Sequence, residues 1–492
     1  MKYISTRDIN LKVTASQAIA RGLAPDGGLF VPETMPALSQ SEIESLCGMD
    51  YRGRALYIMS KFLDEFDRQE LESFVGAAYG DNFYHPNVAP LSMLGNSTAM
   101  LELWHGPTCA FKDMALQMLP HLLTASLRKN GEKREVCILV ATSGDTGKAA
   151  LEGFKDVEGT RIIVFYPRDG VSDIQKLQMI TQTGRNVLVS AVAGNFDDAQ
   201  TGVKTIFRDR EFEKTLDGRG FFLSSANSIN WGRLLPQVVY YVSAYCDLLK
   251  ANRIKMGEKV NFCVPTGNFG NILAAWYAKR MGLPVKRLIC ASNRNNILTD
   301  FITTGVYDRN REFHTTISPS MDILISSNLE RLLFALSSDA EVSYYMSRLS
   351  ETGRYVVGDK VKGAVQADFA AGYCTDEDTK AEIKRVFREY NYLMDTHTAV
   401  AYKVLRDYRQ ASGDSSVAVV VSTASPFKFA EDVLDALGVK DRNESPLKAL
   451  AEATGMAAPA PLEGLENRPV RFSGCVEKSE MLSLVDGFLS KR

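Results

Sequence analysis

One lysine stands where it could react as a neutral amine. Lys112 follows the rigid turn Gly106-Pro107 and precedes a segment that is apolar on nearly every face. Such a segment predicts a buried helix with Asp113 in its first turn, which places Lys112 at an apolar edge and beside the positive helix end. Both surroundings disfavour the ammonium form and lower the pKa of a lysine. A neutral lysine can attack a carbonyl and form a Schiff base.

This interpretation of Lys112 needs support from the rest of the chain. A solvated surface lysine ahead of a helix is the commoner arrangement, because lysine is almost never buried without a role. Pro120 interrupts the apolar segment and predicts a kink there.

A glycine-rich turn between a strand and a helix predicts a phosphate-binding loop. Glycines let the backbone approach a ligand closely, and the free N–H groups at a helix start face an anion. The spacing is not that of the dinucleotide-binding fingerprint. An ordinary turn shaped only by its glycines is the alternative. The candidate residues are Gly267, Asn268, Phe269, Gly270 and Asn271.

A second turn of this kind predicts a site for a substrate carboxylate. It is not a nucleotide P-loop, because Thr142 stands where the first glycine belongs and Ala149 follows Lys148. The carboxylate of Asp145 would repel an anion unless it is paired. A helix capped by Thr146 or Asp145 is the alternative. The candidate residues are Ser143, Gly144, Asp145 and Thr146.

Short apolar runs separated by helical segments predict an α/β fold with buried parallel strands. The expected strands are 136–140, 162–165, 187–189, 261–264, 288–290 and 417–421, and the expected helices between them are 147–155, 172–183, 197–210 and 271–282. Residues 1–90 differ, with expected helices at 40–47, 54–65 and 68–79 and a Gly/Pro-rich turn at 25–28. We therefore predict an N-terminal helical unit (1–90), an α/β body (91–430) and a C-terminal segment packed on the body (431–492).

Composition narrows the classes of function. The chain has 492 residues and a formal net charge of −2, with acidic and basic residues interleaved, which argues against nucleic acid or a membrane as partner. Without a leader or a membrane-spanning run, a cytoplasmic protein is expected. The eight cysteines form no C-x-x-C pair and the five histidines show no ligand spacing, so we expect buried thiols and no catalytic metal.

The motifs occur in an order that resembles threonine synthase, a pyridoxal-phosphate enzyme of the tryptophan-synthase β fold. Each is weak alone, but together they are specific. The resemblance runs from the N-terminus to at least Phe429. Its segments are 16–19, 22–29, 104–113, 143–147, 194–200, 227–231, 267–271 and 422–429.

The resemblance implies a fold-type II enzyme with two parallel-sheet α/β lobes, the smaller at roughly 100–230, and the active site between them. Lys112 would carry the cofactor as a Schiff base, and loop 267–271 would bind its phosphate. Thr423 would contact the pyridine nitrogen, where a hydroxyl leaves the ring a weaker electron sink than a carboxylate would. Loop 143–147 would hold the substrate carboxylate or the cofactor hydroxyl.

The implied reaction converts O-phospho-L-homoserine and water to L-threonine and phosphate, the last step of threonine biosynthesis. Candidates for the substrate phosphate are Asn230, Arg233 and Lys148, with solvated helix charges as the alternative for the two cations. Two other functions stay open: a related phospholyase that releases 2-oxobutyrate, and a noncatalytic ligand-binding homologue. The expected assembly is a monomer or a homodimer.

Overall fold

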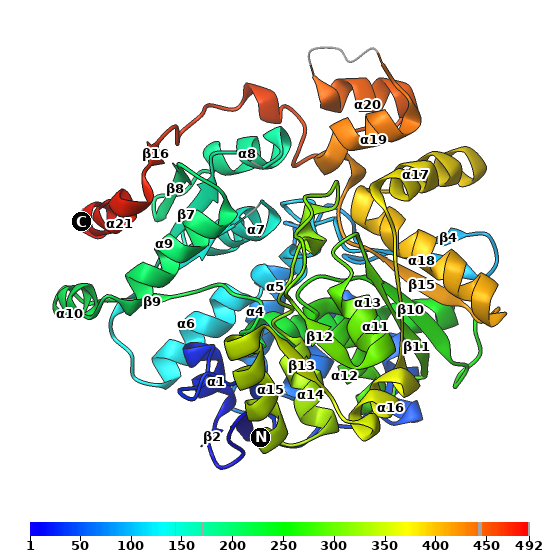
Figure 1. Cartoon of the computed structure of the whole chain (residues 1–492), viewed down its shortest axis with the longest axis horizontal. Coiled ribbons are helices and arrows are strands. Elements are labelled where there is room, and N and C mark those ends of the chain that lie inside the picture. Colours follow the sequence, from blue (N-terminus) through cyan, green and yellow to red (C-terminus); the bar gives the residue numbers. More distant parts are fainter. Residues whose placement is uncertain (143, 170, 441–444, 491–492) are drawn as a thin grey trace.

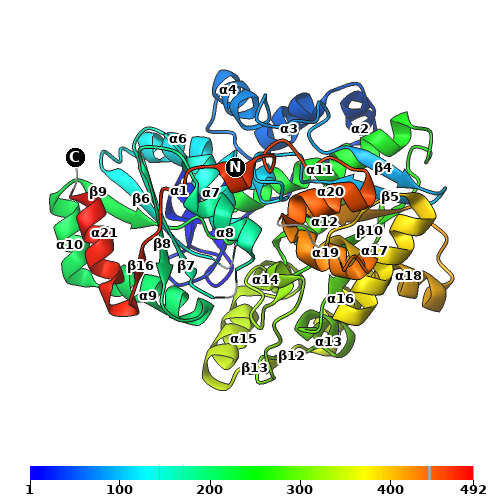
Figure 2. The same cartoon turned by 90° about the horizontal axis from the view of Figure 1, so that it is seen from above.

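The computed structural model describes residues 1–142, 144–169, 171–440 and 445–490, and its ribbon is drawn in Figure 1. Two parallel sheets form two α/β lobes that lie side by side, as Figure 2 shows. This mixed α/β architecture with parallel sheets is the fold class that the sequence predicted.

The larger sheet has six strands in the order β14-β11-β10-β15-β5-β4. Only the edge pair β4–β5 is antiparallel. The expected strands 261–264, 288–290 and 417–421 are found here as β10, β11 and β15, whereas β4, β5 and β14 were not predicted. The bounds are Leu91–Leu94 (β4), Thr98–Glu102 (β5), Val260–Pro265 (β10), Val285–Ser292 (β11), Phe369–Tyr373 (β14) and Ala418–Ser422 (β15).

The smaller sheet has five parallel strands in the order β16-β8-β7-β6-β9. Its three central strands were predicted, and β9 and β16 were not. The strands are Glu135–Ala141 (β6), Thr160–Pro167 (β7), Val187–Val192 (β8), Phe221–Ser224 (β9) and Cys475–Val476 (β16). The helices are Asp145–Phe154 (α7), Asp173–Ile180 (α8), Phe196–Arg208 (α9) and Arg210–Gly218 (α10).

The N-terminal residues form three strands and four helices. Side-chain caps define the helix starts: Ser39 and Asp67 each form a capping box with the glutamate three residues on. The antiparallel sheet β2-β1-β3 was not predicted. The elements are Tyr3–Ser5 (β1), Lys12–Val13 (β2), Ala15–Arg21 (α1), Phe30–Pro32 (β3), Gln40–Cys47 (α2), Tyr51–Ser60 (α3) and Arg68–Ala78 (α4).

The apolar segment after Lys112 is buried, as expected, but it forms two helices rather than one kinked helix. Helix α5 (Asp113–Leu116) stops before α6 (Leu119–Lys129), and Pro120 lies in the first turn of α6, where its missing N–H costs nothing. Gly153 of α7 allows a close approach, because a Cβ there would lie 2.0 Å from the carbonyl oxygen of Leu116.

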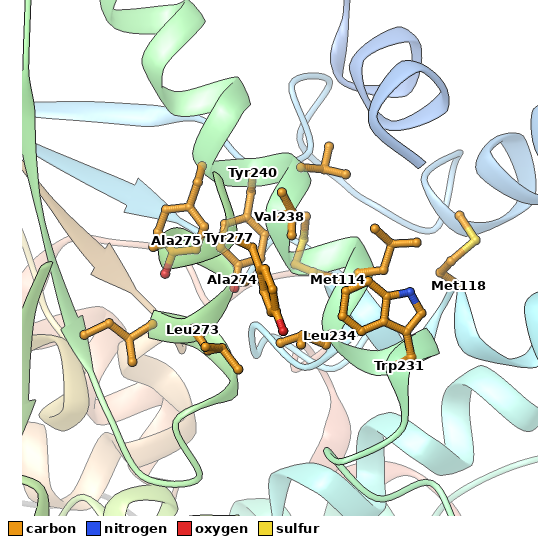
Figure 3. Packing of buried hydrophobic residues seen from close by; sticks show 14 of the residues in the cluster. Met114, Met118, Trp231, Leu234, Val238, Tyr240, Leu273, Ala274, Ala275 and Tyr277 are labelled. Atoms are coloured by element: carbon orange, nitrogen blue, oxygen red, sulfur yellow. The ribbon is translucent and has the colours of Figure 1, made fainter. Parts of the chain in front are cut away.

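Helix α11 (Trp231–Lys250) runs through the core and packs against α12 (Gly270–Met281) and α5. Figure 3 shows Trp231 of α11 beside Met114 and Met118, with Tyr277 of α12 next to the same cluster. The ring of Trp231 meets Tyr277 edge to face at 5.6 Å. Helices α5, α11 and α12 are therefore fixed by one continuous apolar core.

Most of the remaining helices and strands lie around the larger sheet, and the last of them, β16 and α21, belong to the smaller lobe. Strand β16 joins the smaller sheet beside β8, and α21 packs against α9, as Figure 2 shows. The C-terminal segment thus spans both lobes. The elements are Ile297–Thr304 (α13), Val306–Asp308 (β12), Leu329–Leu336 (α14), Asp339–Thr352 (α15), Arg354–Val356 (β13), Asp359–Asp368 (α16), Asp376–Tyr390 (α17), Thr396–Ser412 (α18), Ala430–Leu437 (α19), Pro446–Thr454 (α20) and Met481–Leu489 (α21).

All eight cysteines are free thiols; six are buried, Cys47 is partly buried and Cys475 is exposed. Among the residues that the structure describes, none of the helices combines the length and apolar character needed to cross a bilayer.

Candidate active site

Three chemically distinctive segments leave the larger sheet at one edge. Strands β10, β15 and β5 are adjacent and parallel, so their carboxyl ends lie together. Loop 267–271 follows β10, Thr423 follows β15, and the Lys112 segment follows β5. The N–H of Phe111 donates to the carbonyl oxygen of Thr423 at 2.7 Å. The structure therefore brings Lys112 close to Thr423, which is 311 positions later in the sequence.

Lys112 has the electrostatic surroundings of a reactive amine. Its pKa is lowered to about 8, chiefly by burial; Asp145 opposes the shift, and the nearby cations Arg233 and Lys428 add to it. Burial outweighs the expected helix-dipole effect, because α5 has only four residues. The Nζ atom of Lys112 donates to the Oγ atom of Ser320 at 3.3 Å.

Loop 267–271 leads into a helix whose N-cap residue supplies no side-chain cap. Helix α12 begins at Gly270, after Phe269 in the left-handed region (φ 63°), and no side chain caps its first turn. Gly267 lies against a neighbouring chain segment, since a Cβ there would be 2.7 Å from the carbonyl oxygen of Ser320. The carbonyl oxygens of Gly267 and Asn268 accept bonds from Ser326 and Asn328, which fixes the loop from outside.

The side chain of Asn271 is oriented by two tyrosines. The hydroxyls of Tyr240 and Tyr241 donate to its Oδ1 atom at 2.5 and 2.6 Å. Within the described part of the chain, its buried Nδ2 atom has no hydrogen-bond partner. A buried donor without a partner is costly, so it marks a place for a ligand acceptor.

The turn into α7 is closed by its own residues. Gly144 is in a strained region (φ 143°), and the Oγ1 atom of Thr142 accepts the N–H groups of Gly144 and Gly147. Helix α7 begins at Asp145, its N-cap residue Gly144 supplies no side-chain cap, and the Thr142 hydroxyl takes the Gly147 N–H of the first turn instead. The expected alternative, a cap by Thr146 or Asp145, is therefore not what forms. Ser143 lies outside the described residues.

Asp145 is paired, which removes the repulsion that its charge would cause. Its Oδ1 atom lies 2.8 Å from the buried Nζ atom of Lys428 and accepts a bond from Gln175 at 2.8 Å. Burial opposes ionisation, but Lys428 and Lys112 outweigh it and hold the pKa of Asp145 below its usual range. Because Lys428 follows β15 and Asp145 follows β6, this pair joins the two lobes.

The three candidate ligands of the substrate phosphate differ in how many of their polar atoms already have partners. Arg233 is buried, its Nη1 atom donates to the carbonyl oxygen of Ala226, and among the described residues its Nε atom has no partner. Burial lowers its pKa to about 10. Lys148 is also buried but pairs with Glu152 at 2.9 Å. Neither cation is a solvated helix charge.

Asn230, the third candidate, caps helix α11. Its Oδ1 atom accepts the N–H of Gly232 at 2.8 Å, and its Nδ2 atom donates to the carbonyl oxygen of Ile19 at 2.9 Å. Arg233 is therefore the candidate with unused capacity for an anion.

Sequence reasoning missed four residues of the site: Gln175, Ser320, His397 and Lys428. Lys428 lies in a segment that carried the resemblance, which was the one available signal. Ser320 is 208 positions from Lys112, and nothing in its neighbouring residues distinguishes it.

Three family models match the chain. Residues 2–79 match the threonine synthase N terminus, residues 95–423 match the pyridoxal-phosphate dependent enzyme family, and residues 398–483 match the threonine synthase C-terminal family.

Relatives and solved structures agree with these matches. The chain is 43% identical to threonine synthase-like 1 of Homo sapiens over 90% of its length, and spans 62% of that relative. It is 41% identical to threonine synthase of Pseudomonas aeruginosa, covering 88% of this chain and 90% of the other. A pyridoxal-phosphate-bound threonine synthase structure from Brucella melitensis matches with TM-score 0.88 and 38% identity, covering 99% of this chain and 98% of that one. The yeast threonine synthase structure matches with TM-score 0.90 and 33% identity, covering 100% and 99%.

The residues around Lys112 fit pyridoxal phosphate. Its aldehyde needs an amine that can be neutral near physiological pH, and Lys112 is such an amine. Its phosphate needs donors, which the uncapped start of α12 and the unpartnered Nδ2 atom of Asn271 provide. With these matches, the fold-type II architecture that the resemblance implied and this arrangement of donors around one partly buried amine, the chain belongs to the threonine synthase family of pyridoxal-phosphate-dependent enzymes.

Proposed function

We propose that this protein is a threonine synthase, which converts O-phospho-L-homoserine and water to L-threonine and phosphate. The observation that carries the proposal is that two unusual cations, Lys112 and Arg233, lie close enough for Arg233 to add to burial in lowering the pKa of Lys112. The pKa of Lys112 is lowered to about 8, and Arg233 is a buried guanidinium whose Nε atom has no partner among the residues that the structure describes. A cofactor amine beside an anion site suits an amino-acid substrate with a phosphate.

We assign the cofactor to the edge where β5, β10 and β15 end. Lys112 would bond to it, the loop Gly267, Asn268, Phe269, Gly270 and Asn271 would hold its phosphate, and Thr423 would face its ring nitrogen. Bound pyridoxal phosphate withdraws electrons from the substrate carbon chain and so acidifies the Cα–H bond.

Lys112 would move the protons. Its neutral Nζ atom takes the proton from Cα of the substrate and can return a proton at Cγ after the phosphate leaves. The pKa of about 8 suits an amine that must both accept and donate.

Arg233 would bind the substrate phosphate through its free Nε atom. The turn into α7, with Ser143, Gly144, Asp145 and Thr146, would bind the substrate carboxylate, where Lys428 compensates the charge of Asp145. Asn230 would act by holding the start of α11, and with it Arg233, in place.

Product analysis tests the proposal. Purified protein supplied with pyridoxal phosphate and O-phosphohomoserine should give threonine and phosphate in equal amounts. The Lys112→Ala variant should lose the visible cofactor band and turn over at least about 100-fold more slowly, because a positioned acid–base group contributes about 10²–10⁴. The exposed Lys133→Ala variant is the matched control and should keep both.

A phospholyase is the second candidate, since it would use the same cofactor residues. Relatives named threonine synthase-like 1 are as similar to the chain as a relative named threonine synthase, so family membership alone does not select the synthase activity. The phospholyase would release 2-oxobutyrate, ammonia and phosphate from the same substrate and water. Predominant 2-oxobutyrate would select this activity over the synthase. A protein that stays colourless with added cofactor would instead indicate the noncatalytic homologue.

A further inference from the structure

Ser320 is a polar neighbour of the Lys112 amine, and the proposed function assigns it no role. It lies in a short 3₁₀ turn, Pro319–Met321, and its Oγ atom accepts a hydrogen bond from Lys112 Nζ at 3.3 Å. Its carbonyl oxygen faces Gly267 so closely that a Cβ on that glycine would lie 2.7 Å away. Ser320 therefore contacts both the Lys112 amine and loop 267–271.

The backbone of Ser320 is held by a buried histidine. The N–H of Ser320 donates to the Nε2 atom of His397 at 3.1 Å, and the Nδ1 atom of His397 lies 2.9 Å from Oδ1 of Asp395. His397 and Asp395 are 2% and 0% exposed, and the ring of Phe429 packs on the imidazole at 4.8 Å.

The direction of these hydrogen bonds determines which ring nitrogen of His397 carries the proton. A backbone N–H can only donate, so Nε2 must carry a lone pair and the ring proton must be on Nδ1, facing Asp395. Asp395 is held in turn by the N–H groups of His397 and Thr398 at the start of α18. His397 is thus a neutral acceptor whose orientation is set by a helix N-cap.

The residues are those of a Ser-His-Asp triad, but the bonds are arranged differently. In a nucleophilic triad the imidazole accepts from the serine hydroxyl. Here it accepts from the serine backbone, and the hydroxyl faces Lys112 instead. This arrangement positions Ser320 rather than activating it.

We propose that Ser320 is a positioning residue for the Lys112 amine, and that His397 and Asp395 act on Lys112 through Ser320. The proposal rests on the function proposed for Lys112. The Ser320 hydroxyl holds the amine by accepting its N–H, which directs the nitrogen lone pair during cofactor capture and proton transfer. Deleting Asp395 or His397 releases the Ser320 backbone, so the hydroxyl no longer meets the amine.

The first test measures how fast cofactor-free protein captures pyridoxal phosphate, followed as the rise in visible absorbance and by borohydride trapping on Lys112. Ser320→Ala should slow capture about 10-fold, the effect of one hydrogen bond of about 1.4 kcal/mol. The kcat for O-phosphohomoserine should fall by a similar factor of about 10, with KM within about twofold, because substrate binding is untouched. Ser337→Ala removes a hydroxyl that bonds only within α14 and is the matched control.

The second test asks whether His397 acts through Ser320. His397→Leu lacks an acceptor and should slow capture as Ser320→Ala does, whereas the amide oxygen of His397→Gln can accept the Ser320 N–H and should restore most of the rate. In the double variant, His397→Leu should add little to Ser320→Ala, because residues on one path are not additive. If His397→Leu does not fold, Ser320→Ala and His397→Gln still decide the matter.

Capture and turnover of Ser320→Ala at the wild-type rate would overturn the proposal. So would a full additional loss in the double variant, or a His397→Gln variant that captures the cofactor no faster than His397→Leu. Wild-type protein that never develops the visible band would instead refute the function proposed for Lys112, so the two failures are distinguishable.

Discussion

The turns into α7 and α12 look alike in sequence and differ in charge. Both follow a buried strand, both are rich in glycine, and in neither helix does the N-cap residue supply a side-chain cap. The turn into α7 contains a carboxylate, Asp145, that is paired with Lys428. Loop 267–271 has no ionisable residue and keeps an unpartnered Asn271 donor among the described residues. Two glycine-rich helix starts can therefore serve different ligands, and the difference lies in how their polar groups are satisfied.

Removing the partner of Asp145 should have the largest effect. Lys428→Met leaves a carboxylate buried and unpaired, so the free energy of unfolding should fall by about 3–5 kcal/mol in urea titrations. The double variant Asp145→Asn/Lys428→Met should recover part of that loss. Lys478→Met breaks an exposed pair with Asp198 and is the control, with little change expected. Equal stability of Lys428→Met and wild type would mean that the interlobe pair is not needed.

Removing the free donor of loop 267–271 should weaken cofactor binding. Asn271→Ala deletes a hydrogen bond to a charged phosphate, worth about 1.5–3 kcal/mol, so the Kd for pyridoxal phosphate should rise about 10- to 150-fold. Fluorescence titration measures the Kd. The exposed Asn87→Ala variant should bind normally. Unchanged binding by Asn271→Ala would show that the cofactor phosphate does not bind at the start of α12.

Cofactor capture should depend on pH through Lys112, which lies between the two turns. Its pKa is lowered to about 8, so the amine is protonated and unreactive below that pH and neutral above it. The capture rate of cofactor-free protein should fall about tenfold per pH unit below 8 and level off above it. Stopped-flow absorbance at several pH values gives the midpoint. A midpoint near 10.5 would show that burial does not tune the amine.

The tyrosines behind Asn271 should have the smallest effect. Tyr241→Phe removes one of two donors to the Asn271 oxygen, and the other remains, so cofactor binding should weaken by about 0.5–1.5 kcal/mol. The exposed Tyr344→Phe variant is the control. If Tyr241→Phe costs as much as Asn271→Ala, the two tyrosines are required together to orient the amide.

Much of the fold could be predicted because its central strands are buried on both faces. Runs such as 136–140 and 162–165 are apolar throughout and matched β6 and β7. Strand β5 was missed because Thr98–Glu102 ends in a glutamate and contains few β-branched residues, yet it is buried beside β15. Strand β16 has two residues, and only the edge of β8 makes it a strand.

Part of the candidate site could be predicted because it also depends on local sequence patterns. Lys112 and loop 267–271 are recognisable locally, because a turn, a helix start and glycine spacing are short-range properties. Their roles stay predictions. Ser320, His397 and Lys428 could not be found this way, since each gains its importance from a contact with a residue far away in the sequence.

The sequence by itself determined the α/β class, the position of Lys112 at the edge of a buried apolar segment and the family, because these depend on local patterns and on the order of motifs. Only the tertiary structure decided that Asp145 is neutralised by Lys428, that Arg233 is a buried cation with an unused donor, and that Ser320 faces the amine. Charge compensation and hydrogen bonding depend on distance in space. Residues hundreds of positions apart, such as Asp145 and Lys428, come within that distance only in the folded chain.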